Sequence, residues 1–219
     1  MEGIERKRVG QKGRDAILAR IRAAQPPKKP SHEVKLGQVF APIGDVRVRF
    51  REECKANLME LVETNSAAES AAAIGRVLES LPEGRFFVQD EGSLRGLVER
   101  IPHGRVTTWS TAEAVPEDTQ VTLTLADGLV AQTGSILSSS GCGGRGASAV
   151  PVCHIVYATT AQLMPDIETA LLFAQKNGIT ERSSYVGLIS GSSRTADIEK
   201  ILVQGAHGPR RLVVVVEKV

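Results

Sequence analysis

Apolar residues in the first half of the chain recur at the three- and four-residue spacing that is typical of helices. Ile17, Leu18 and Ile21 share one face of a predicted helix over residues 14–24, and the prolines that follow it end the helix. Residues 50–64 form a second amphipathic pattern of this kind. The same reasoning predicts further helices over residues 66–81, capped by Ser66, over 93–101, over 164–177, closed by Gly178, and over 194–204.

Short apolar runs between these helices predict strands. The run LVVVV at residues 212–216 shows no alternation of apolar and polar residues, which is typical of a strand covered on both faces. The strand, helix, strand order over residues 185–216 predicts a right-handed βαβ unit. We therefore expect an α/β fold with an open, mostly parallel, Rossmann-like sheet. The predicted strands are residues 85–89, 121–126, 129–131, 135–138, 152–157, 185–189 and 212–216.

Charge is unevenly distributed along the chain. Residues 1–53 contain 13 Lys and Arg against 7 Asp and Glu, whereas residues 54–219 contain 14 against 18. We therefore predict a basic helical arm and linker over residues 1–49 and one α/β domain over residues 50–219. The arm is either solvated or in contact with an acidic partner or RNA. With one Trp, two Tyr and five Phe, the chain has few residues for base stacking, which argues against nucleic acid as a partner.

Neither a secretory signal nor a membrane span is expected, and the cytoplasm is the expected location. The first residues, MEGIERKRVGQKGRD, lack an apolar core, and no stretch reaches the ~18 apolar residues of a membrane span. The cysteines, Cys54, Cys142 and Cys153, form no C-x-x-C pair. We therefore expect no disulfide framework and no iron–sulfur cluster held by this chain alone, since a cluster needs four thiolates. Together with His154 and His207 they match no zinc motif, so no metal site is expected.

The first candidate site is the turn after the predicted strand 185–189. Unpaired N–H groups at a helix N-terminus attract anions, and Ser192 or Ser193 can cap the helix predicted to begin there. Arg194 and Thr195 can add a cation and a hydroxyl for a carboxylate or phosphate. Ligands of open α/β sheets sit at the carboxyl ends of strands, where this turn is expected to lie. A capped helix without a ligand fits the same residues equally well.

Two titratable residues near this turn are the candidate catalytic groups. Asp197 can pair with Arg194 or accept a hydrogen bond from a ligand hydroxyl. His207, followed by Gly208 and Pro209, can act as a general acid or base because a histidine pKa lies near neutrality. A structurally bonded or surface histidine is the alternative for His207.

The glycine-rich segment over residues 132–148 is the second candidate site. Gly141, Gly143 and Gly144 let the backbone approach a ligand closely, and consecutive N–H groups can form an anion-binding nest beside Arg145. The segment matches neither of the glycine fingerprints of nucleotide-binding proteins. A surface loop without a ligand is the alternative.

Both segments resemble signatures of the lactate-utilisation protein C family, whose members carry a LUD domain. ADGLVAQTGSILSSSGCGGRGASAVPVCHIVY resembles the central signature, and GSSRTADIEKILVQGAHGPRRLVVVV resembles the C-terminal one. The resemblance covers about residues 50–219 and implies a fold of the sugar-isomerase and CoA-transferase type. It also implies one pocket lined by Thr133, Gly134, Ser135, Arg145, His154, Ser193, Arg194, Thr195, Asp197, His207, Gly208 and Pro209.

The resemblance further implies a role in bacterial oxidation of L-lactate to pyruvate, beside two iron–sulfur partner proteins that hold the cofactors. Gln132 stands where the family usually has Glu, and an amide transfers no proton near neutral pH. We therefore expect an accessory or substrate-handling subunit that binds a small anionic ligand. A free-standing, isomerase- or cyclo-ligase-like enzyme acting on a small phosphorylated or carboxylated substrate is the alternative. An RNA-contacting regulator, acting through the basic arm, is a third.

Overall fold

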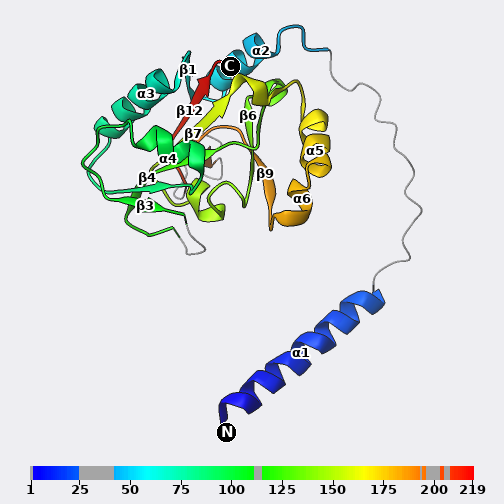
Figure 1. Cartoon of the computed structure of the whole chain (residues 1–219). Coiled ribbons are helices and arrows are strands. Elements are labelled where there is room, and N and C mark those ends of the chain that lie inside the picture. The colour runs from blue at the N-terminus through cyan, green and yellow to red at the C-terminus, as the bar shows by residue number, and fades with distance from the viewer. Residues whose placement is uncertain (1, 25–41, 111–114, 193, 196–202, 205–207) are drawn as a thin grey trace. The chain divides into compact units, whose positions relative to one another are not determined.

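The computed structural model describes residues 2–24, 42–110, 115–192, 194–195, 203–204 and 208–219, with the backbone alone for residues 2–12, 194–195 and 203–204. Contacts divide the chain into two compact units, residues 1–41 and 42–219. In the first unit, helix α1 (Glu2–Ala24) confirms the helix predicted over residues 14–24 and begins earlier (Figure 1). No helix in the described part of the chain combines the length and apolar character needed to cross a membrane.

The second unit is built on a six-stranded sheet in which every pair of neighbouring strands is parallel. Its strand order is β1–β12–β7–β4–β2–β3. This arrangement confirms the predicted α/β fold with a mostly parallel sheet. The inner strand β12 is buried on both faces, which explains the apolar run LVVVV. The strands are β1 (Glu60–Thr64), β2 (Arg85–Val88), β3 (Thr107–Trp109), β4 (Thr119–Leu125), β7 (Cys153–Thr159) and β12 (Arg211–Glu217).

Helices α3 (Ala67–Glu79) and α4 (Gly92–Val98) cover one face of this sheet (Figure 1). Buried side chains such as Ile74 of α3 and Leu94 of α4 form a single core with the strand residue Ile155. Ser66 caps α3, as predicted, because its hydroxyl accepts a hydrogen bond from the Glu69 N–H at 3.2 Å.

Helix α2 (Val46–Ala56) and a second sheet cover the other face. The second sheet has the order β8–β5–β6–β9, and its residues Leu129 and Ile136 share a core with Val156 and Val214 of the main sheet. Its outer side packs against α5 (Ile167–Lys176) and α6 (Ile179–Arg182). As predicted, Gly178 closes α5 in a left-handed conformation. The four strands are β5 (Gly128–Val130), β6 (Ser135–Ser139), β8 (Leu163–Met164) and β9 (Val186–Ile189).

The helix predicted over residues 50–64 is wrong in its second half. Helix α2 ends at Ala56, Leu58 turns the chain with a positive φ of 54°, and residues 60–64 form strand β1. Each residue of β1 pairs with a residue of β12, which lies about 150 positions further along the chain. Pairing with this distant strand outweighs the local helical periodicity.

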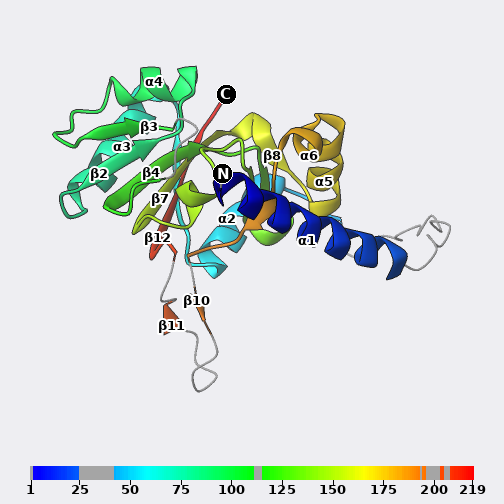
Figure 2. The ribbon, with the colours of Figure 1, turned by 90° about the horizontal axis from the view of Figure 1, so that it is seen from below.

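The helix predicted over residues 194–204 is wrong at both ends. Arg194–Thr195 forms strand β10 and Val203–Gln204 forms strand β11, and the two strands pair antiparallel (Figure 2). Residues 196–202 lie outside the described part of the chain. The predicted βαβ unit is also wrong, because β9 pairs antiparallel with β6 in the second sheet and not with the main sheet.

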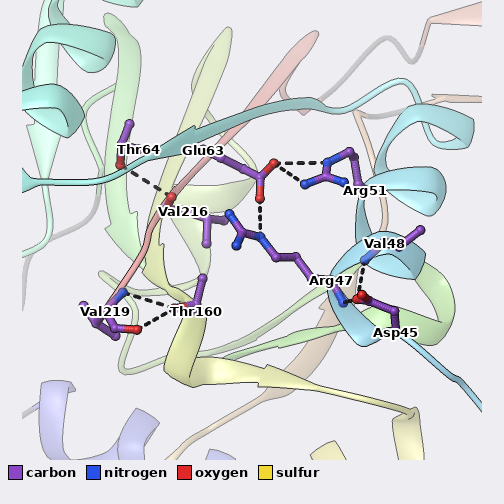
Figure 3. A network of polar contacts seen from close by, with 9 residues as sticks. All are labelled: Asp45, Arg47, Val48, Arg51, Glu63, Thr64, Thr160, Val216 and Val219. Carbon is purple, nitrogen blue, oxygen red and sulfur yellow. Dashed lines mark hydrogen bonds and ion pairs between the residues drawn. The ribbon is translucent and has the colours of Figure 1, made fainter.

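Polar contacts fasten α2 to the edge of the main sheet (Figure 3). Arg47 and Arg51 of α2 contact the Glu63 carboxylate of β1, at nitrogen–oxygen distances of 2.7 and 2.6 Å. Burial alone would raise the pKa of Glu63, but hydrogen bonds from the two guanidinium groups lower it overall. Asp45 caps α2 by accepting hydrogen bonds from the backbone of Arg47 and Val48, both at 2.9 Å. The two ion pairs hold α2 against the edge strand β1, and the Asp45 cap fixes the start of the helix.

Candidate functional site

A strip of buried polar side chains crosses the face of the main sheet that lies under the glycine-rich segment. Thr122 and Thr124 of β4 and His154 of β7 are each at most 1% exposed. The Thr122 hydroxyl donates to the Ala147 carbonyl at 2.7 Å, and Thr124 Oγ1 lies 2.9 Å from His154 Nε2. Alternation of threonine with apolar residues in VTLTLA is the sequence signal for this polar face.

The two ring nitrogens of His154 differ in their surroundings. Nε2 faces Thr124, whereas the buried Nδ1 has no hydrogen-bond partner among the described residues. Burial lowers the pKa of the imidazole from 6.5 to about 4, so the ring is neutral near pH 7. A neutral imidazole in this state can make one further hydrogen bond, and the bonding partner of Nε2 decides whether Nδ1 donates or accepts.

His154 lies in the wall of a pocket of about 370 Å³. This volume falls in the ~300–1,000 Å³ range of small-molecule sites, which are mostly apolar with a few polar groups. The pocket brings together the end of the glycine-rich segment, the turn after β9 and the residues before β12. Its described lining consists of Ser148, Ala149, His154, Ile189, Gly191, Gly208, Pro209 and Leu212.

The pocket lies at the amino ends of β7 and β12. His154 and Leu212 are the second residues of these strands and stand opposite each other in register. The expectation of a site at the carboxyl ends of the parallel strands is therefore wrong for this pocket. At the carboxyl ends of β7 and β12, the Tyr157 hydroxyl donates to Glu217 at 2.7 Å, and Ser70 of α3 donates to the same oxygen at 3.1 Å. These hydrogen bonds connect α3, β7 and β12 at the carboxyl ends of the two strands.

The turn after β9 differs from its prediction. Because Arg194–Thr195 is a strand, no helix begins there, and the helix N-terminus proposed as an anion site is wrong. Gly191 lines the pocket, and Ser192 beside it is partly exposed. Ser193, Asp197 and His207 lie outside the described residues, and only the backbone is described for Arg194 and Thr195.

Most of the glycine-rich segment lies outside the pocket wall. Gly143 and Gly144 have φ angles of 78° and 84°, which side-chain-bearing residues rarely adopt. The Gly141 N–H donates a hydrogen bond to Ser139 Oγ at 3.2 Å. The exposed Arg145 lies with its guanidinium carbon 5.3 Å from the centre of the Tyr185 ring. Of the segment, Ser148 alone belongs to the described pocket lining.

A chain of hydroxyl groups connects the segment before β6 to the pocket turn. Thr133 Oγ1 lies 2.6 Å from Ser135 Oγ, which lies 2.5 Å from Ser190 Oγ. Ser190 directly precedes the pocket residue Gly191. Asn57 at the end of α2 donates to the Thr133 carbonyl at 2.8 Å. Thr133 and Ser135 thus hold the pocket turn in place and do not line the pocket themselves.

Gln132 contacts the start of α5. Its Oε1 accepts a hydrogen bond from the Ile167 N–H at 3.3 Å. Gln132→Ala should lower the free energy of unfolding by about 1 kcal/mol, because this N–H loses its acceptor. Gln132→Glu should be at least as stable as the wild type, because the carboxylate keeps the acceptor and adds negative charge at the positive end of the helix dipole.

Urea denaturation measures both effects. Gln175→Ala, an exposed position on the same helix, is the matched control and should change the free energy of unfolding by less than about 0.5 kcal/mol. Equal stability of Gln132→Ala and Gln175→Ala would show that the hydrogen bond from Ile167 to Gln132 does not stabilise the start of α5.

All three cysteines are free and buried in separate elements. Burial raises the pKa of the Cys54 and Cys153 thiols to about 12 and that of Cys142 to about 11. Since the thiolate is the reactive form, none of these cysteines is activated as a nucleophile near neutral pH.

The all-parallel main sheet, the covering helices and the glycine-bordered pocket define a Rossmann-like α/β protein. A solved structure of a DUF162 family protein from Deinococcus radiodurans has a similar fold, with a TM-score of 0.61, 19% sequence identity, and coverage of 80% of this chain and 99% of that one. The sequence model of the LUD domain matches residues 48–216. The chain therefore belongs to the LUD domain family.

Curated relatives agree with this assignment and confirm the resemblance to the lactate-utilisation protein C family. Lactate utilization protein C of Bacillus pumilus is 32% identical over 184 residues, or 75% of each chain. The protein of the same name from Halalkalibacterium halodurans is 31% identical over 129 residues, 55% of this chain and 56% of that relative. The uncharacterized protein YkgG of Escherichia coli is 28% identical over 180 residues, 77% of each chain. The match thus spans about half of the H. halodurans protein and three quarters of the other two.

Proposed function

We propose that this chain is an accessory, substrate-handling subunit in L-lactate utilisation that binds a small anionic ligand in the His154 pocket. One observation carries the proposal: where three segments distant in the sequence meet, the wall of a ligand-sized pocket contains a buried histidine, one nitrogen of which has no partner among the described residues. The names of the relatives, lactate utilization protein C, supply the metabolic context.

The turns on either side of the pocket suit an anion. Gly191 and Gly208 have φ angles of 109° and 89°, which glycine adopts without strain, and the backbone N–H groups of these turns are proposed to face the ligand. In the proposed site, Arg194 and His207 provide positive charge and a titratable group, as the family resemblance implies. The ligand is therefore expected to lie between His154 and these two turns.

The electrons of lactate oxidation are proposed to pass through iron–sulfur partner proteins. Conversion of L-lactate to pyruvate removes two electrons and two protons. An iron–sulfur cluster is usually held by four thiolates, whereas this chain contains three cysteines, and these are buried in separate elements. The chain therefore cannot supply a complete set of cysteine ligands, and its proposed task is to handle the substrate.

Affinity purification of the tagged full chain from lactate-grown cells tests the subunit role. Iron–sulfur proteins should be recovered with it, and the recovered assembly should convert L-lactate to pyruvate, whereas the isolated chain should not. Recovery of the chain alone would argue against the subunit role, and turnover of L-lactate by the purified chain would support a free-standing enzyme instead.

Blocking the pocket tests the ligand site. Ala149 lines the pocket at the surface, and Ala149→Trp should weaken binding of L-lactate at least about 10-fold in calorimetry because the indole fills the entrance. Ala161→Trp is the matched control, since Ala161 is also exposed in a short 3-10 helix (Thr160–Gln162) and does not line the pocket. Equal affinity of the two variants would show that L-lactate does not bind here.

A further inference from the structure

His154 differs from the rest of the described pocket wall. The apolar side chains of Ala149, Ile189, Pro209 and Leu212 form much of the remaining surface. We propose that His154 Nδ1 recognises an uncharged oxygen on the carbon next to the ligand's carboxylate, so that the pocket selects 2-hydroxy and 2-oxo monocarboxylates. This inference rests on the proposed function and specifies the class of ligand.

The orientation of the His154 ring supports this assignment. Strand β7 lies between β4 and β12, so His154 has Thr124 of β4 on one side and Leu212 of β12 on the other. The hydrogen bond of 2.9 Å to Thr124 fixes Nε2 on the β4 side. The pocket residues Leu212, Pro209 and Gly208 belong to β12 and the segment before it. Thr124 thus occupies Nε2, and Nδ1, which is buried in the pocket wall, is the ring nitrogen left to bond a ligand.

Charge decides which part of the ligand meets this nitrogen. The imidazole is neutral at physiological pH, and none of the described lining residues carries a net charge. A carboxylate pressed against a neutral ring and apolar walls would lose its hydration without gaining a counter-charge, which is costly. A hydroxyl or carbonyl oxygen needs only one hydrogen bond there. The carboxylate then faces the glycine turns, and an alkyl group packs against Ile189 and Leu212.

Comparison of three probes on the full chain tests the inference. L-Lactate and pyruvate carry an oxygen on the carbon next to the carboxylate, whereas propionate has the same carbon chain without it. Calorimetry should show at least about 10-fold weaker binding of propionate, because it leaves the buried Nδ1 unpaired. Binding of propionate within about two-fold of L-lactate would overturn the inference.

Imidazole ¹⁵N resonances supply a second measurement that needs no stable variant. The resonances of His154 should shift with L-lactate and pyruvate and change little with propionate. In His154→Phe, L-lactate and propionate should bind with similar affinity, and that variant also identifies the His154 signals among the four histidines of the chain. Unchanged His154 resonances in the presence of bound L-lactate would also overturn the inference.

The outcomes separate this inference from the function on which it rests. If all three probes bind equally well in the pocket, the site binds carboxylates whether or not the carbon next to the carboxylate carries an oxygen. In that case only the inference fails. If none of them binds, the proposed ligand and the inference both fail. Weaker binding of propionate together with shifted His154 resonances supports both.

Discussion

Gly134→Ala should lower the free energy of unfolding by about 2–5 kcal/mol. Gly134 has φ 57° and ψ 39°, a left-handed conformation that costs a side-chain-bearing residue roughly 1–2 kcal/mol. A methyl group there would also lie 2.7 Å from the carbonyl carbon and Cβ of Glu53 and 2.8 Å from the Cys54 nitrogen. Since these are mostly backbone atoms, α2 would have to move, and such overpacking costs about 1–3 kcal/mol more.

Gly178→Ala is the matched control for this variant. Gly178 has a similar conformation, φ 66° and ψ 20°, but a methyl group there would meet only the ends of the Arg182 and Glu181 side chains, at 3.6 Å. It should therefore cost only the conformational term of roughly 1–2 kcal/mol. Urea denaturation measures both variants. Similar losses in the two would show that α2 adapts to the methyl group without strain.

The effect of Gly134→Ala should extend to the pocket. Gly134 lies between Thr133 and Ser135, whose hydroxyl groups connect to Ser190 beside the pocket turn. Folded Gly134→Ala should therefore bind L-lactate more weakly than the wild type, because this segment is displaced. Gly134 itself does not line the pocket. In this interpretation, Gly134 belongs to the site because it supports the residues around it.

Lowering the pH from 7.5 to 5 should cost about 2 kcal/mol of stability through His154. Its pKa is about 4 in the folded protein, against 6.5 when exposed. Between these values the unfolded chain binds a proton that the folded chain does not, so stability is fully present above pH 6.5 and falls with the pH below it. Each pH unit in this window corresponds to about 1.4 kcal/mol. Most carboxylates remain ionised above pH 5, so they contribute little to this change.

Urea denaturation at several pH values between 5 and 7.5 measures this dependence. His154→Gln should remove most of the slope, because an amide does not titrate there while it can still form a hydrogen bond with Thr124. His103→Gln is the control and should retain most of the slope, since His103 is only partly buried and a hydrogen bond with the Arg105 backbone opposes the lowering of its pKa by burial. A slope that persists unchanged in His154→Gln would mean that folding does not lower the pKa of His154.

Parts of the site could be predicted from the sequence. The glycine-rich segment, His154, Gly208 and Pro209 were candidates, and the structure places Ser148, at the end of that segment, with His154, Gly208 and Pro209 around one pocket. The lining residues Ile189 and Leu212 were not candidates, because each reads as an ordinary core residue of a strand. Gln132, Thr133 and Ser135 were expected in the pocket wall, whereas their side chains contact α5 and the turn after β9.

The sequence by itself determined the features that depend on neighbouring residues: the cap of α3 at Ser66, the end of α5 at Gly178 and the doubly covered strand at residues 212–216. These follow from local hydrogen bonding, backbone conformation and burial, which a short stretch of sequence already specifies. Only the tertiary structure decided that residues 60–64 form a strand, that β9 joins a second sheet and that the pocket lies at the amino ends of β7 and β12. Each of these depends on pairing with a strand distant in the sequence, and the periodicity of a single segment carries no information about its partner.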